Sequence, residues 1–129
     1  MQEDPEISLE IINDHYRHPR NYGKVENPAL SLTEHNPVCG DTLHFTISMS
    51  GRIIENIKFI GSGCSISQAS ASMLTERAIG KDYEEVLKIS EREWIDQMGI
   101  RLGPNREKCA LLSLSAVKKM LRDYADRDR

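Results

Sequence analysis

Asn36-Pro37-Val38-Cys39-Gly40-Asp41 leads directly into the segment Thr42 to Met49, in which apolar and polar residues alternate. Residues two apart in an extended chain point to the same face of a sheet. The alternation therefore predicts a strand over this segment, with Cys39 and Asp41 on its apolar side. The thiol of Cys39 and the carboxylate of Asp41 would then lie side by side where the loop passes into the strand. Together they would supply two of the four ligands of a metal site.

The segments after this strand predict an α+β fold. The run from Arg52 to Ile60 is rich in β-branched residues and follows the turn Ser50-Gly51, which indicates a hairpin. Gly61-Ser62-Gly63 ends the second strand, and a helix with many small residues is expected from about Cys64 to Gly80, packed closely on the sheet. Further helices are expected over residues 82–89, 91–98 and 105–124.

The segments before the strand predict one helix and a long connection. The helix is expected from about Pro5 to Arg17, with Asp4 as its N-cap. Its periodic positions along one face are Ile7, Ile11 and His15. Residues 24–38 contain two prolines and few apolar runs, so we expect a largely irregular or edge-strand connection there. The whole order predicts a small antiparallel sheet with an N-terminal helix and three or four C-terminal helices packed on one face.

Length and composition indicate a single domain over residues 1–129, because a chain of this size buries one core without further support. A net charge of -3 gives no sign of nucleic-acid binding. No apolar run approaches the ~20 residues of a membrane span, and the acidic start does not resemble a signal peptide. We therefore expect a cytoplasmic protein with neither a nucleic-acid nor a membrane partner. Its three cysteines are not expected to form disulfides in that reducing compartment.

The other half of the metal site would have to be Cys64 and Cys109, because the chain has three cysteines in all. Cys64 is expected at the N-terminus of a helix, where exposed amides favour a thiolate. Cys109 is expected on the inward face of the last helix. Three thiolates and the carboxylate of Asp41 suit a tetrahedral Zn²⁺ ion or one edge of an iron–sulfur cluster. The residues alone leave open a second interpretation, in which each cysteine is a small buried apolar residue.

Residues 36–41, 61–72 and 108–109 carry three cysteine motifs, and Asp14-His15-Tyr16 lies on the helix before them. In this order the motifs resemble those of the IscU/SufU/NifU family of iron–sulfur cluster assembly proteins. The resemblance covers nearly the whole chain. It implies the α+β fold of that family and a site that binds zinc or assembles a [2Fe-2S] cluster. The ligands that it implies are Cys39, Asp41, Cys64 and Cys109.

Different features of the chain point to two branches of this family. Residues 65–72 and Lys108 resemble the SufU branch, whose members are zinc-bound acceptors of persulfide sulfur. The insertion that SufU proteins typically carry between the second and third cysteines is absent here. IscU scaffolds usually have His in place of Lys108, and residues 102–106 depart from the motif by which a dedicated chaperone recognises IscU. The chain therefore resembles a compact member between the two branches.

The resemblance implies that the chain receives sulfur from a cysteine desulfurase, assembles a cluster and passes it to apo iron–sulfur proteins. We interpret Cys109 as the candidate persulfide acceptor and Asp41 as a weak ligand that keeps the cluster transferable. Arg106 and Lys108 are candidate supporting cations that would lower thiol pKa values or stabilise a persulfide, and an ordinary charged surface is the alternative. Two other functions stay open: a zinc-dependent sulfur acceptor that builds no cluster, and a structural zinc protein.

Three of the four histidines are not expected to act at this site. His15 and His18 lie three apart on the first helix, and a solvated or capping role is favoured over a shared metal ion. His44 is expected on the wetter face of its strand. His35 directly precedes the metal loop and stays a candidate for a role there. Trp94 is expected in the core.

Overall fold

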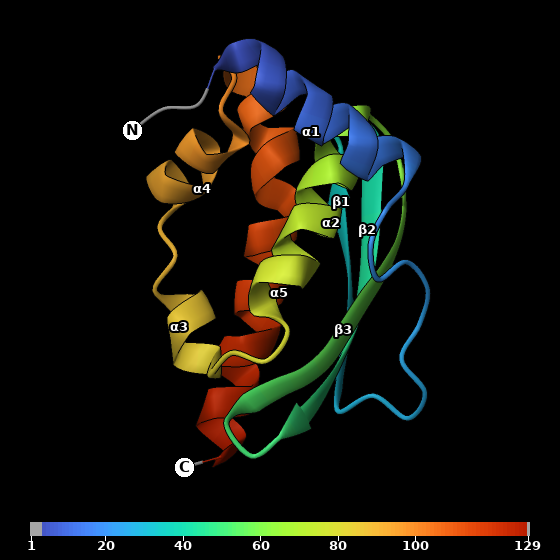
Figure 1. Cartoon of the computed structure of the whole chain (residues 1–129). Helices are drawn as coiled ribbons and strands as arrows, with labels where there is room; N and C mark the ends of the chain where they lie inside the picture. The colour runs from blue at the N-terminus through green and yellow to red at the C-terminus, as the bar shows by residue number, and fades with distance from the viewer. Residues whose placement is uncertain (1–3, 129) are drawn as a thin grey trace.

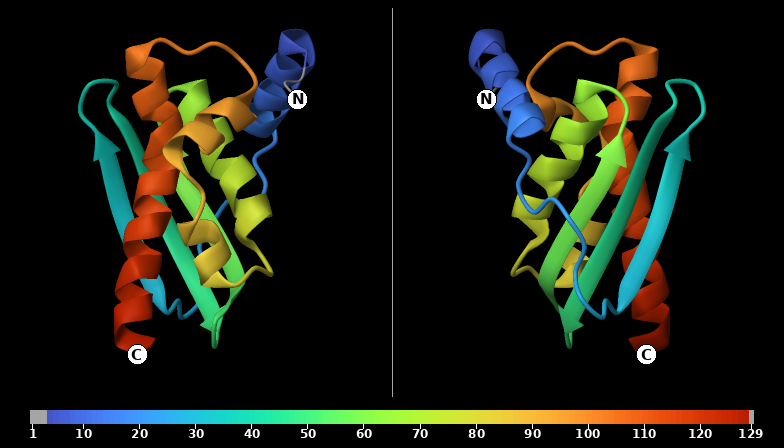
Figure 2. Two further views of the ribbon diagram at one scale, coloured as in Figure 1. Left: turned by 90° about the vertical axis from the view of Figure 1, so that its left-hand side faces the viewer. Right: turned by 90° about the vertical axis from the view of Figure 1, so that its right-hand side faces the viewer.

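The computed structural model describes residues 4–128 and shows the α+β fold expected from the sequence (Figure 1). A three-stranded antiparallel sheet is covered by helices on one face, and of the described residues only the connection that follows the first helix lies on its other face (Figure 2). In the described part of the chain, no helix has the length and the apolar character needed to cross a membrane. In chain order the elements are α1 (Pro5–Arg17), β1 (Leu30–Asn36), β2 (Asp41–Ser50), β3 (Ile53–Ser62), α2 (Ser65–Ala78), α3 (Tyr83–Leu87), α4 (Glu91–Met98) and α5 (Pro104–Asp128).

The predicted hairpin is the β2–β3 pair, and the strand order of the sheet is β1-β2-β3. Phe45 lies opposite Phe59, and Ile47 lies opposite Ile57. All four side chains are buried, so the alternation seen in the sequence does separate a core face from an outer face. The core face is the one that the helices cover.

The third strand, β1, lies in the segment for which we expected a largely irregular or edge-strand connection. Leu30–Asn36 pairs with β2 along its whole length and forms an edge of the sheet, so the edge-strand alternative is the correct one there. Glu34 interrupts the apolar period of this strand. Its carboxylate lies 2.6 Å from Lys119 Nζ of α5. An ion pair thus takes the place of an apolar contact, which is why the hydrophobic pattern did not reveal the strand.

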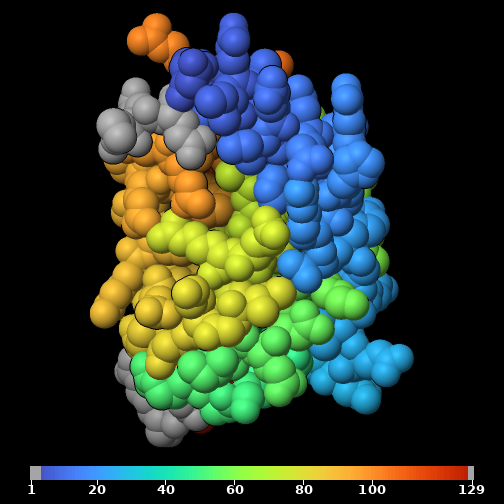
Figure 3. All heavy atoms as spheres, in the orientation of Figure 1, coloured from blue at the N-terminus to red at the C-terminus, as the bar shows by residue number. Residues whose placement is uncertain are grey.

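The helix α2 is the centre of the helical layer, because it contacts α1, α5 and β3 (Figure 1). Every residue from Ile66 to Ser72 is buried. The side chains of α1 and of the connection after it close over one side of α2 (Figure 3). The small residues of this helix predicted close packing on the sheet, and in the structure they allow neighbours on several sides to approach it.

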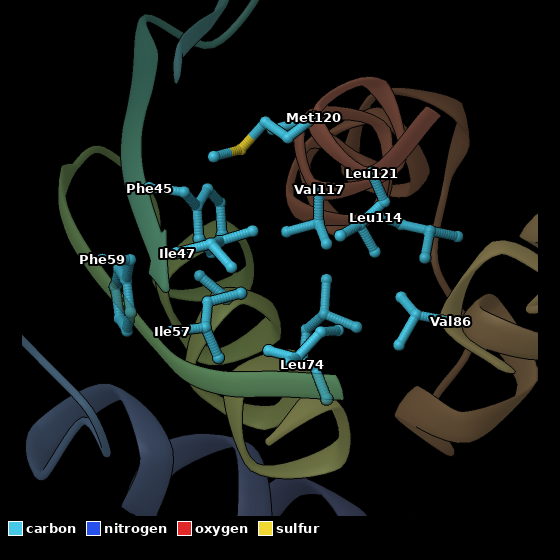
Figure 4. Close-up of a cluster of buried hydrophobic side chains, with 14 of the residues drawn as sticks. Phe45, Ile47, Ile57, Phe59, Leu74, Val86, Leu114, Val117, Met120 and Leu121 are labelled. Carbon is cyan, nitrogen blue, oxygen red and sulfur yellow. The ribbon is translucent and has the colours of Figure 1, made fainter. Parts of the chain in front are cut away.

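The main core lies between the sheet, α2 and α5, and it includes Phe45, Phe59, Leu74, Leu114 and Leu121 (Figure 4). Trp94 of α4 is fully buried, as predicted, and its indole N–H donates to Ser70 Oγ at 2.8 Å. Ser70 donates to the carbonyl of Ala110 at 2.7 Å, and the hydroxyl of Ser113 lies 2.8 Å from it. These bonds form a satisfied polar network that joins α2, α4 and α5.

The buried face of α1 is formed by Ser8, Ile12 and His15, so His15 alone of the three periodic positions lies on it. Ile12 and His15 are buried, whereas Ile7 and Ile11 are 54% and 37% exposed. The solvated or capping role expected for His15 is wrong, because its ring is buried and its Nδ1 lies 2.7 Å from the hydroxyl of Ser72 in α2. That hydroxyl gives the ring a partner, so the polar group is tolerated inside.

The burial of His15 predicts a dependence of stability on pH. Burial lowers the pKa of His15, and the cation of Arg20 lowers it further, against smaller opposing effects of Glu76 and Asp14. In the unfolded chain the ring returns to its ordinary pKa of about 6.5, so the unfolded state takes up a proton first as the pH falls. The stability that depends on the neutral ring is therefore complete above about pH 6.5 and is lost as the pH falls below that value. We expect the free energy of unfolding, measured with denaturant, to fall less from neutral to mildly acidic pH in His15→Gln than in the native chain.

The matched control for this measurement is His18→Gln, because His18 is exposed at the end of the same helix. This variant should keep the pH dependence of the native chain. An equal loss of stability in the native chain and in His15→Gln would assign the acid sensitivity to other groups.

Candidate metal centre

The four candidate ligands come from different elements that meet at one end of the molecule. Cys39 lies in the turn that joins β1 to β2, and Asp41 is the first residue of β2. Cys64 is the N-cap of α2, and Cys109 lies in the first turns of α5. The turn between β1 and β2, the start of α2 and the start of α5 lie at the same end of the fold (Figure 2).

Two of the thiols and the carboxylate lie close together. One ligand atom each from Cys39, Asp41 and Cys109 can be chosen so that all three lie within 4.8 Å of one another. The sulfur atoms of Cys39 and Cys109 are 3.1 Å apart. Cys64 falls outside this group of three, but its sulfur lies 3.9 Å from Asp41 Oδ2. The arrangement is therefore a compact trio with the fourth candidate at its side.

Exposure differs sharply among these residues. Asp41 and Cys109 are each only 1% exposed, Cys64 is half-buried and Cys39 is exposed. The centre thus has a buried floor and one open side, formed by the turn that carries Cys39. A reagent or partner that approaches from solvent meets Cys39 first.

Asp41 is held in place by the backbone that leads into α2. Its Oδ1 accepts a hydrogen bond from the backbone N–H of Cys64 at 2.8 Å. Gly63 has a φ of +128° there, and a Cβ atom at this position would lie 2.1 Å from Asp41 Oδ1. Glycine is therefore required for two reasons, the backbone conformation and the close approach of the carboxylate.

Asn36 is a residue at this site whose role was not identified from the sequence. Its side chain is buried, its Nδ2 donates to the sulfur of Cys109 at 3.7 Å, and its Oδ1 accepts from the N–H of Val38 at 3.2 Å. The backbone N–H of Gly40 donates to the carbonyl of Asn36 at 2.8 Å, which closes the turn. The sequence feature that could have indicated a role for Asn36 is its position as the first residue of the cysteine motif, directly before a proline.

The electrostatic surroundings of Cys109 differ from what its basic neighbours suggested. Arg106 and Lys108 are exposed, and among the described residues no hydrogen bond or ion pair joins either of them to a cysteine. Burial raises the pKa of Cys109, and contacts with Cys39, Asp41 and Cys64 raise it further. The pKa of this thiol thus moves upward, opposite to the direction expected from nearby cations.

The chemistry of the donor set fits a metal cation. Two thiols and a carboxylate crowd together here, and a third thiol lies beside them, so ionising them without a cation would place like charges next to each other. A bound cation reverses that penalty, because thiolates and carboxylates are its ligands. Three sulfur donors with one oxygen donor suit tetrahedral Zn²⁺ or the thiolate ligation of an iron–sulfur cluster.

The histidines lie away from this trio. His35 is exposed on β1 and His44 is half-buried on β2, both on the outer face of the sheet, so His44 lies where we expected it. His18 is exposed at the end of α1. None of the three belongs to the group of close ligand atoms found within residues 4–128.

Comparison with known proteins identifies related chains. Residues 8–129 match the family model described as NifU-like N terminal domain. The zinc-dependent sulfurtransferase SufU of Bacillus subtilis is 40% identical over 127 aligned positions, which cover 85% of this chain and 86% of the relative. The iron-sulfur cluster assembly scaffold protein IscU 1 of Archaeoglobus fulgidus is 39% identical over 113 residues, which cover 88% of this chain and 73% of the relative. A crystal structure of FiSufU from Fervidobacterium islandicum AW-1 is 30% identical and has a TM-score of 0.74, covering 87% of this chain and 94% of that chain.

The alignment with the Bacillus relative also bears on chain length. It has 127 positions but covers only 85% of these 129 residues, so the relative contributes residues within the alignment that this chain lacks.

Gly63→Ala should damage the centre through Asp41. The added Cβ would overlap the carboxylate, and the backbone would have to hold an L-residue at a strongly positive φ. We expect a loss of about 2 kcal/mol in the free energy of unfolding and zinc binding that is weaker by roughly tenfold or more. The measurements are denaturant unfolding and competition for zinc with a chromophoric chelator. Gly103→Ala is the matched control, because a Cβ at Gly103 would have no atom within 4 Å; equal effects in both variants would refute the role of Gly63.

Proposed function

The chain belongs to the family of NifU-like N-terminal domains, and from this membership we propose that it is an iron–sulfur cluster assembly scaffold whose residues 1–129 work as one domain. It accepts sulfur from a cysteine desulfurase, assembles a [2Fe-2S] cluster and transfers the cluster to apo iron–sulfur proteins. The observation that supports this most directly is the trio of two thiols and one carboxylate within 4.8 Å. The proposed ligands are Cys39, Asp41, Cys64 and Cys109.

Cys109 is the proposed acceptor of the incoming sulfur. The thiol of Cys109 gives up its proton and attacks the outer sulfur of the persulfide on the desulfurase. A new S–S bond forms on Cys109, the S–S bond of the donor breaks, and the cysteine of the desulfurase leaves as a thiol after taking up the proton. Because Cys109 is buried and Cys39 lies 3.1 Å from it on the exposed side, the turn over residues 37–40 has to move aside for this step. Arg106 and Lys108 are exposed near Cys109 in the chain, and we propose that their positive charges stabilise the anionic persulfide.

Asp41 is the proposed exchangeable ligand. Its Oδ1 is committed to the N–H of Cys64, and its Oδ2 faces the sulfur of the same residue at 3.9 Å. The carboxylate therefore offers one oxygen atom from a fixed position. Soft thiolates hold iron in clusters more firmly than a single carboxylate oxygen does, so this is the position at which a ligand from an acceptor protein enters.

A second candidate function is a zinc-dependent sulfur acceptor that builds no cluster itself. It is supported by the 40% identity to a zinc-dependent sulfurtransferase and by Lys108 before the third cysteine. In that function Cys39, Asp41, Cys64 and Cys109 would hold a zinc ion, which would favour the thiolate form of the cysteines, and Cys109 would take up the sulfur. A purely structural zinc ion is the third candidate, and removal of any ligand would then unfold the domain.

Reconstitution separates these functions. The metal-free protein is incubated under anaerobic conditions with iron(II), cysteine, a cysteine desulfurase and a thiol reductant, which supplies the electrons that reduce persulfide sulfur to sulfide. Visible absorption is recorded with iron and sulfide counts. We expect a chromophore with equal amounts of iron and sulfide that moves to an apo-ferredoxin. Zinc binding with faster desulfurase turnover and no chromophore would establish the sulfur acceptor instead. Zinc binding with no response of the desulfurase would leave the structural role.

Asp41→Ala should slow transfer of a reconstituted cluster by several-fold or more, because the exchangeable position is lost. Asp41→Asn separates coordination from structure, since its amide oxygen keeps the acceptor for the N–H of Cys64 but is a poor ligand for iron. Both variants should retain the cluster longer than the native chain in a timed transfer to apo-ferredoxin. If both transferred as quickly as the native chain, the exchange role of Asp41 would be wrong.

A further inference from the structure

The outer face of the sheet carries a second group of metal-ligating side chains, separate from the cysteines. In the β1–β2 ladder His35 lies opposite Thr42, and Thr33 lies opposite His44. All four residues alternate with inward-facing ones, so they share the outer face. His35 and His44 are thus diagonal neighbours on adjacent strands, an arrangement in which long side chains of a sheet reach each other.

Each of the two rings forms a hydrogen bond across the strands to the threonine directly opposite it. His44 Nδ1 lies 2.8 Å from the hydroxyl of Thr33, and His35 Nδ1 lies 3.1 Å from the hydroxyl of Thr42. Each ring therefore leans over the opposite strand, to the residue beside the other histidine. The two rings thus lie on neighbouring rungs of the ladder, and each is held at its Nδ1 atom.

The anchoring leaves the other nitrogen of each ring available. When Nδ1–H donates to a threonine hydroxyl, Nε2 carries the free lone pair of the neutral ring. Within residues 4–128 neither Nε2 has a hydrogen-bond partner. A ring that binds a metal through one nitrogen usually donates a hydrogen bond from the other, so the two threonines supply the outer contacts that such ligands need.

The pair is open to solvent. His35 is exposed and His44 is half-buried. The connection after α1 crosses this face of the sheet beyond them, where Val25 N–H donates to Thr46 and Gly23 N–H donates to Phe59 (Figure 2). An ion can therefore reach both rings from the solvent side and keep water in its remaining coordination positions.

We propose that His35 and His44 form a second metal site, which binds a divalent transition-metal ion that prefers imidazole, such as Zn²⁺, Ni²⁺ or Cu²⁺, through the two Nε2 atoms. The site shares no residue with the cysteine centre. Asp41 points inward from β2, whereas His44 points outward from the same strand. Both sites are filled at the same time, so the chain holds two ions when metal is in excess.

A nickel titration tests the site in the full chain after the thiols have been loaded with one equivalent of zinc. Paramagnetic broadening of imidazole resonances is followed by NMR. We expect the resonances of His35 and His44 to broaden together, at nickel concentrations at least tenfold below those that broaden His18. His35→Gln and His44→Gln should each abolish this broadening at low nickel concentration, which we call the early phase. His18→Gln, the matched exposed control, should leave the early phase unchanged. A single variant that keeps the early phase, or resonances of the pair that broaden no earlier than those of His18, would overturn the proposal.

Two further variants test the anchoring without removing a ligand. Thr33→Val and Thr42→Val keep the shape of the side chain but lose the hydroxyl that holds Nδ1. Nickel affinity should fall roughly tenfold in each, in line with the usual effect of outer contacts on metal ligands. Unchanged affinity in both, with native unfolding curves, would show that the rings are not oriented by the threonines and would contradict the proposed geometry.

Discussion

The contact between Asp41 and the backbone N–H of Cys64 is the constraint on which the metal centre depends. It ties the first residue of β2 to the start of α2, two elements that are 23 residues apart in the chain. Gly63 makes the contact possible, because a side chain there would occupy the space of the carboxylate. The positions of Asp41 and Cys64 are therefore set by how α2 packs on the sheet, and not by the motif around either residue alone.

The packing of α2 is in turn fixed by polar groups. A helix that is buried on most sides has no single apolar stripe to choose its rotation. Ser70 and Ser72 are two residues apart, which is about 200° around a helix, so they point to opposite sides. The hydroxyl of Ser70 forms hydrogen bonds with Trp94 of α4 and Ala110 of α5. The hydroxyl of Ser72 forms a hydrogen bond with His15 of α1. Only one rotation of α2 about its own axis allows Ser70 and Ser72 to form their hydrogen bonds at the same time. That rotation also sets the direction in which the side chain of Cys64, the N-cap residue, points.

The parts of the fold that local pattern determines could be predicted from the sequence, and the parts that distant contacts determine could not. The alternation around Phe45 identified β2, and the three cysteine motifs identified the family. The sequence did not decide between an irregular connection and an edge strand for β1. The apolar period is broken there by Glu34, which forms an ion pair with Lys119 of α5. A solvated or capping role was expected for His15, because no local signal shows that Ser72 lies beside it. The contact of Asn36 with Cys109 and the close approach at Gly63 likewise join residues far apart in sequence.

The short distance between the sulfur atoms of Cys39 and Cys109 has a consequence for handling the protein in air. Once metal-free, the two thiols lie 3.1 Å apart with Cys39 open to solvent, so dissolved oxygen or a small disulfide reagent can oxidise them to an intramolecular disulfide. That bond consumes two of the four proposed ligands at once. A preparation exposed to oxygen would therefore look inactive and metal-free although its fold is intact, and treatment with a thiol reductant would restore it.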